Sequence, residues 1–132
     1  MLELLSPAGS MEALRAAVQN GANAVSLGIG TFNARQGAKN FTLETLGEAL
    51  KYCHVRGVDV HLTLNTLVAD REFKAVSELI RRTAELGVDA FIVQDLGVAQ
   101  LCRQIAPEVP VHGSTQLTVH SLPGVQLCAA LG

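Results

Sequence analysis

One pattern recurs along this chain: a helix-like stretch runs into a glycine, and a short apolar segment follows. The pattern occurs at Gly21, Gly57 and Gly87, and a fourth helix-like stretch runs into Gly132. Glycine ends a helix readily because it lacks a Cβ and adopts the left-handed conformation at little cost. The apolar segments are typical of buried parallel strands. The repeat therefore predicts an α/β fold, and we expect the chain to be a piece of a larger one.

Five strand–helix units follow from this pattern, and they allow either an open doubly wound sheet or part of an eight-stranded barrel. In the third expected strand, polar Asp59, His61 and Thr63 alternate with apolar residues. A barrel interior accepts polar side chains near its catalytic end, whereas a sheet covered on both faces is usually apolar throughout. We predict an incomplete TIM-type βα barrel, with five units of eight, in a single domain over residues 1–132. The expected strands are residues 2–5, 24–28, 58–64, 89–94 and 111–114.

Composition and charge exclude several classes of protein. Of the 132 residues, 48% are hydrophobic and 17% are charged, as in ordinary folded domains. A net charge of −2 does not show the positive charge that is typical of nucleic-acid-binding domains. No apolar run is long enough to span a membrane and the start lacks a secretion signal, so we expect a cytoplasmic protein without membrane contact. Cys53, Cys102 and Cys128 lie in apolar helical patterns and are expected to be buried thiols.

Amide side chains recur where the expected strands end. Asn65, Gln94 and Gln116 follow three different strands, and the C-terminal ends of parallel strands meet at one edge. Amides donate and accept hydrogen bonds without charge, which suits a neutral polar ligand or an enclosed carboxylate. Polar residues at strand ends also cap the helices that follow, and we favour this role for Ser10 and Asp95.

Two histidines are expected on the inner face of the sheet, His61 and His112. Without a nearby carboxylate cluster they are more typical of core groups than of metal ligands, and we predict no metal site. Ser114 lies two residues after His112, which places both on one strand face. No acid is evident to orient a nucleophile–base pair. We therefore count His112 and Ser114 as substrate-binding candidates and assign no catalytic residue.

The segment after the second expected strand, residues 31–41, is longer than most connections of its kind, and long loops tend to be functional. Arg35 can grip a carboxylate or phosphate with its planar guanidinium, and Lys39 adds a second cation. Phe32 and Phe41 are expected to pin the loop to the barrel. We count Asn33, Arg35 and Lys39 as substrate-binding candidates, the alternative being a solvated surface loop.

Six short motifs at these strand ends and in this loop resemble the N-terminal part of peptidase family U32, the collagenase-like proteases. The resemblance covers nearly the whole chain. Two positions depart from the usual family pattern: Ser26 stands where relatives carry tyrosine, and Gly113 stands where alanine is common. The motifs are Leu-Leu-Ser-Pro-Ala-Gly-Ser at 4–10, Phe-Asn-Ala-Arg at 32–35, Ala-Lys-Asn-Phe at 38–41, Leu-Asn-Thr-Leu at 64–67, Val-Gln-Asp-Leu-Gly at 93–97 and His-Gly-Ser-Thr-Gln at 112–116.

The resemblance implies a TIM-like barrel and two kinds of activity. Some family members are named as peptidases, without agreed catalytic residues. Others take part in hydroxylation of tRNA uridines, of a ribosomal RNA cytidine or of ubiquinone precursors; they use cysteines for an iron–sulfur cluster, and prephenate is implicated for the RNA enzymes. The family's cysteine signature lies beyond the matched part. We therefore expect no cofactor in this chain, and any iron–sulfur cluster to use cysteines beyond residue 132.

Three functions stay open from the sequence. The complete protein takes part in RNA base hydroxylation, or it is a true peptidase acting on proteins or peptides, or the chain is an inactive truncated barrel. Five strands of eight are too few for a barrel active site, which draws residues from several strands, so we expect the 132 residues alone to be inactive. The partner is then an RNA or a peptide, and an open barrel edge invites self-association.

Overall fold

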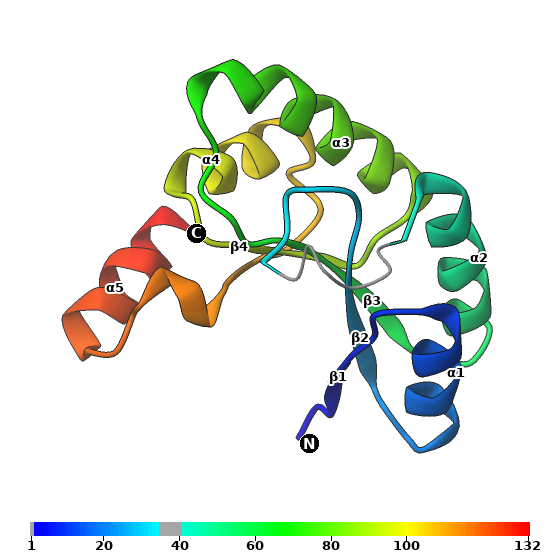
Figure 1. Ribbon diagram of the computed structural model, residues 1–132. Coiled ribbons are helices and arrows are strands. Elements are labelled where there is room, and N and C mark those ends of the chain that lie inside the picture. The colour runs from blue at the N-terminus through cyan, green and yellow to red at the C-terminus, as the bar shows by residue number, and fades with distance from the viewer. Residues whose placement is uncertain (1, 35–40) are drawn as a thin grey trace.

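The computed structural model describes residues 2–34 and 41–132, which form one parallel sheet with helices around it (Figure 1). Each strand pairs in parallel with the next one along the chain, in the order β1-β2-β3-β4-β5. The strands are β1 (Leu5–Pro7), β2 (Ala24–Gly28), β3 (Asp59–Leu64), β4 (Ala90–Val93) and β5 (Val111–Gly113).

The sequential strand order decides between the two predicted architectures. A doubly wound sheet reverses its strand order at one point, and its helices then cover both faces. Here the order never reverses, so right-handed crossovers place all the connecting helices on the same side. Figure 1 shows α1 to α4 following one another around the outside of the sheet. The other face is therefore the inner face of a barrel, and the predicted TIM-type fold with five βα units is confirmed.

The helices begin largely where their capping residues predict. Ser10, Thr42, Asp95 and Ser121 each accept a backbone N–H with the side chain at a helix start. The third helix starts without a side-chain cap, and Asp70 lies in a short 3-10 helix before it, η1 (Asp70–Glu72). The helices are α1 (Met11–Gln19), α2 (Leu43–His54), α3 (Phe73–Leu86), α4 (Leu96–Ile105) and α5 (Leu122–Leu131), and a second 3-10 helix, η2, covers Thr115–Leu117.

The first strand lies later in the chain than residues 2–5. Its pairing with β2 runs from Leu5 to Pro7, so the strand includes a proline. Proline lacks the N–H that a central strand needs, but β1 lies at the edge of the sheet, where proline is tolerated. Before the strand, Leu4 N donates to Asn23 Oδ1 at 2.8 Å, which fixes the chain at its entry into the sheet.

In two of the repeats, the second residue after the helix-ending glycine links neighbouring strands through its side chain. Asn23 accepts the amide of Leu4, and Asp89 Oδ2 accepts the amide of Val60 at 2.7 Å. Asp89 Oδ2 also lies 2.8 Å from His54 Nε2, at the end of α2. The Gly-x-Asx sequence in two of the repeats therefore joins the start of one strand to the strand before it.

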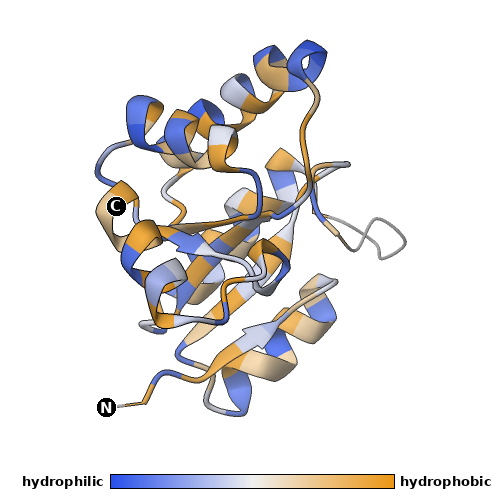
Figure 2. Cartoon of the chain, turned by 90° about the vertical axis from the view of Figure 1, so that its left-hand side faces the viewer, coloured by the Kyte–Doolittle hydropathy of each residue, from blue (hydrophilic) through white to orange (hydrophobic). Residues whose placement is uncertain are grey.

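The core lies between the sheet and the outer helices. Val60, Leu62 and Phe91 of the sheet and Leu14 and Ile80 of the helices are all fully buried. The hydropathy colouring in Figure 2 shows hydrophobic residues along the strands and over much of α5.

Cys53 and Cys102 are buried, as predicted. The prediction for Cys128 is wrong, because this residue is only half-buried and α5 buries no residue fully.

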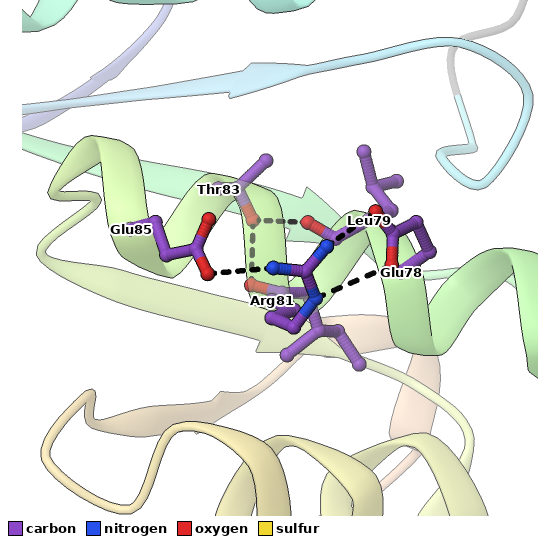
Figure 3. A network of polar contacts seen from close by, with 6 residues as sticks. Glu78, Leu79, Arg81, Thr83 and Glu85 are labelled. Carbon is purple, nitrogen blue, oxygen red and sulfur yellow. Dashed lines mark hydrogen bonds and ion pairs between the residues drawn. The ribbon is translucent and has the colours of Figure 1, made fainter.

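The exposed side of α3 carries an ionic network instead of apolar residues (Figure 3). Arg81 contacts Glu78 at 2.6 Å and Glu85 at 2.7 Å, one helical turn to either side. Thr83 is buried, and its hydroxyl donates to the backbone carbonyl of Leu79 at 2.7 Å. A polar residue thus enters the buried side of α3 because its own helix satisfies it.

Candidate functional site

A cavity of about 550 Å³ opens on the inner face of the sheet, at the C-terminal ends of the strands; we call it the inner-face pocket. The start of the loop after β2 and the segment after β5 complete its wall. No charged side chain is present among the described residues that line it. Its polar side chains are those of Ser26, Asn33, Thr63, Asn65, His112, Ser114, Thr115 and Gln116.

Asn65 joins three separate segments at this pocket. It follows β3, its Oδ1 accepts the backbone N–H of Ala34 at 3.0 Å, and its Nδ2 lies 3.5 Å from Ser114 Oγ. The predicted convergence of distant strand ends is therefore present for Asn65. These two contacts of the Asn65 side chain connect the loop after β2 and the segment after β5 within the pocket wall.

Asn33 lies at the start of the loop after β2 and is only 2% exposed. Its Nδ2 donates to the carbonyl of Gly30 at 3.0 Å. Phe41 is buried and its N–H donates to the carbonyl of Gly28, while Phe32 packs on the core, so both phenylalanines contact the barrel as predicted. Arg35 and Lys39 lie outside the described residues.

The segment after β5 brings Ser114 and Gln116 to the pocket. Ser114 is buried, and its Oγ accepts the N–H of Gln116 at 3.2 Å, capping η2. In the described part of the chain, no hydrogen bond joins His112 to Ser114, which leaves the nucleophile–base alternative without support. Gln116 lines the pocket with an exposed side chain. Gln94 does not line it, and Ile92 is the residue of β4 that does.

His61 and His112 meet on the inner face. Their ring centroids are 5.1 Å apart and the ring planes are nearly perpendicular, at 87°. His61 is only 3% exposed, and its Nδ1 has no hydrogen-bond partner in the described structure. Burial lowers the pKa of His61, the nearby His112 lowers it further, and the more distant Glu3, Asp59 and Asp89 oppose this shift. The surroundings of His61 therefore favour its neutral form.

Ser10 and Asp95 act as helix caps, the role favoured for them from the sequence. Asp95 Oδ1 accepts the N–H groups of Gly97 and Val98, and its Oδ2 accepts that of Val68 at 3.2 Å.

Sequence reasoning had not assigned Ser26 and Thr63 to the site. The alternation of side chains along a strand could have identified them, because both residues lie on the same face of the sheet as His61.

Two of the three cysteines are core thiols on different helices. Cys53 lies in α2 and Cys102 in α4, and both are fully buried. Burial raises the pKa of Cys53 to about 11 and that of Cys102 to about 12, so both are thiols at neutral pH. Over residues 2–34 and 41–132, no three His, Cys, Asp or Glu side chains come close enough to share a metal ion.

A second cavity, of about 570 Å³, lies between α4, β5 and α5. Its wall is mainly apolar, with Leu96, Val111 and Leu131 among its residues. Its polar side chains are Gln100, Gln104 and Arg103, all from α4, and the described residues that line it include no hydroxyl. The inner-face pocket gathers more polar side chains, from several strand ends, and is the better candidate site. None of the described helices is long and apolar enough to cross a membrane.

Comparison with known proteins identifies the family to which this site belongs. The family model described as peptidase family U32 matches residues 9–132. The chain belongs to peptidase family U32. Among solved structures, a U32 peptidase superimposes with a TM-score of 0.74 at 16% sequence identity, over 100% of this chain and 56% of that one. That likeness supports the barrel fold.

The U32 relatives of this chain carry names of two kinds. A Helicobacter pylori protein named tRNA hydroxylation protein P is 42% identical over 99% of this chain and 31% of its own length. The Escherichia coli 23S rRNA 5-hydroxycytidine C2501 synthase is 36% identical over 99% of the chain and 19% of its own length. A Porphyromonas gingivalis protein named Collagenase is 35% identical over 89% of the chain and 28% of its own length. The chain thus spans about a third or less of the length of these relatives.

Proposed function

We propose that this chain supplies the N-terminal part of the barrel in a protein that takes part in hydroxylation of RNA bases, and that the inner-face pocket binds its ligand. The observation that carries the proposal is the 42% identity, over 99% of the chain, to a protein named for tRNA hydroxylation. A second relative, named for synthesis of a hydroxylated cytidine in ribosomal RNA, supports the same class of substrate.

The chemistry of the pocket supports this proposal. A nucleobase presents uncharged donors and acceptors along its edge, and proteins read such edges with amides and hydroxyls. Thr115 and Gln116 present such groups with exposed side chains in one cavity, next to Asn65 and Ser114. In this proposal, Arg35 and Lys39 hold an anionic part of the substrate or of a cosubstrate, since guanidinium and ammonium groups pair with phosphate and carboxylate.

The remaining features of the complete protein are part of the same proposal. In this proposal, an iron–sulfur cluster, where the complete protein uses one, is held by cysteines beyond residue 132. Cys53 and Cys102 are buried thiols on separate helices, and Cys128 lies on a third helix, α5. The protein works in the cytoplasm, where its RNA substrate is found. Strands β1 and β5 are the edges of the described sheet, and a strand edge with free backbone groups invites self-association of this chain.

A chimeric protein tests the proposed function without knowledge of the remaining sequence. Residues 1–132 replace the matching segment of the Helicobacter pylori tRNA hydroxylation protein P, and the chimera is expressed in cells that lack that protein. We expect mass spectrometry of the tRNA nucleosides to show the modified nucleoside with one added oxygen. A stable, soluble chimera that leaves the tRNA unmodified contradicts the proposal.

A peptidase is the second candidate, because of the relative named Collagenase. A serine peptidase needs a hydroxyl, a base and an orienting group in hydrogen-bond contact. Ser114 Oγ is instead engaged with the N–H of Gln116 and the amide of Asn65. Cleavage of gelatin by the purified chimera, lost on Ser114→Ala, would favour this candidate over RNA hydroxylation.

A further inference from the structure

His61 is a buried polar residue on the inner face of the sheet. Its neighbours along β3, Val60 and Leu62, are fully buried, and the histidine ring itself is 3% exposed. Its Nδ1 has no hydrogen-bond partner in the part of the chain that the structure describes. An unpaired buried nitrogen costs free energy, and an apolar side chain of similar size would avoid that cost. Packing alone therefore does not account for histidine at this position.

The contact that distinguishes His61 is its ring contact with His112. His112 lies on β5, lines the inner-face pocket and is exposed on its free side. The 5.1 Å separation and the 87° angle define an edge-to-face pair. The polar edge of an imidazole is attracted to the π face of a second ring, and this attraction favours one relative orientation.

We propose that His61 is a positioning residue for His112, holding the His112 ring in one orientation so that a ring nitrogen faces the ligand of the inner-face pocket. Glu3, Asp59 and Asp89 are the charged groups that act on His61, all from a distance. The identity of the ligand rests on the proposed function, whereas the ring contact does not.

Two substitutions separate positioning from packing. His61→Phe keeps an aromatic ring of similar shape but removes both nitrogens, so it preserves packing and weakens the polar edge contact. His61→Gln removes the ring but keeps an N–H that can approach the face of His112. If His61 only fills space, His61→Phe should disturb the structure around His112 less than His61→Gln does. If His61 positions His112, His61→Gln should disturb the orientation of His112 less.

The reactivity of His112 toward diethylpyrocarbonate measures this effect on the 132-residue chain. The reagent modifies accessible neutral imidazoles, and peptide mass spectrometry gives the rate at each histidine. We expect His61→Phe to slow modification of His112 by about twofold to tenfold, the range of one aromatic contact, while His61→Gln stays near the wild-type rate. His120 is the internal control, because it is exposed, contacts the Thr118 carbonyl and lies outside the ring pair.

An unchanged His112 rate in His61→Phe would overturn the proposal. Circular dichroism checks the fold of both variants, and if His61→Gln does not fold, the His61→Phe rate alone decides. A parallel reaction on the chimera, with added unfractionated tRNA, tests the ligand separately. Protection of His112 but not of His120 supports the proposed function. Absence of protection, with the His61→Phe effect intact, contradicts the RNA ligand and leaves the positioning role standing.

Discussion

Substitution of Gly28 by alanine tests how the pocket wall is built. Gly28 is the last residue of β2, and an added Cβ there would lie 2.6 Å from Asn33 Cγ and 2.8 Å from Asn33 Nδ2. Real Cβ atoms do not approach other atoms so closely. Asn33 is 2% exposed and is held by its hydrogen bond to the Gly30 carbonyl. The Asn33 side chain must therefore leave its position when residue 28 carries a methyl group.

The expected cost follows from two effects. Overpacking of a filled site costs about 1–3 kcal/mol. Loss of the hydrogen bond from the buried Asn33 amide adds about 1 kcal/mol. We therefore expect Gly28→Ala to lower the free energy of unfolding by about 2–4 kcal/mol, measured by urea denaturation followed by circular dichroism.

Gly47 provides the matched control. It lies inside α2, and a Cβ there would meet nothing within 4 Å. Gly47→Ala should stabilise the chain by about 1 kcal/mol, the usual difference in helix propensity. On an Asn33→Ala background, Gly28→Ala should cost less than it does alone, because the obstructing amide is gone. A Gly28→Ala protein as stable as the wild type would refute this account of the pocket wall.

Three further predictions concern thiols, an amide and a histidine. In the folded chain, a soluble disulfide reagent should modify Cys128 and leave Cys53 and Cys102 intact, because only Cys128 is partly accessible; equal rates, measured by mass spectrometry, would contradict the described burial. Asn65→Ala should lower the free energy of unfolding in urea by about 0.5–1.5 kcal/mol, since a loop amide loses its acceptor; an unchanged midpoint and slope would argue against this link. Burial lowers the pKa of His61 from 6.5, so the unfolded chain binds this proton more tightly. Stability should therefore fall as pH drops below about 6.5 until the folded-state pKa is passed, and His61→Phe should remove up to about 1.4 kcal/mol per pH unit of that slope.

The repeat of helix, glycine and strand was enough to predict the fold. Glycine at the helix ends and the apolar runs after it are local signals, and the strand predicted at residues 24–28 coincides with β2. The first strand was misplaced because Leu2 and Leu4 resemble strand residues, yet both are exposed. Pairing with β2 begins only at Leu5, and no local signal encodes where a neighbouring strand starts.

The site was predictable where strand geometry determines it. Asn65 and Gln116 reach one pocket because they follow parallel strands, whose C-terminal ends share an edge. Gln94 follows β4 in the same way, but the pocket is lined there by Ile92, an outcome that depends on which face each residue takes as the strand ends. The ring contact between His61 and His112 depends on the distance across β4, which a sequence does not contain.

The central claim is that the inner-face pocket serves RNA hydroxylation, and a pair of glutamines tests it most directly. Gln116 lines the pocket, whereas Gln19 is an exposed glutamine at the end of α1, outside the residues that line it. Each is changed to alanine in the chimera, and the modified nucleoside in tRNA is quantified by mass spectrometry. We predict that Gln116→Ala lowers modification by at least about tenfold, or about 1.4 kcal/mol, while Gln19→Ala leaves it unchanged. Equal modification in the two variants would contradict the claim.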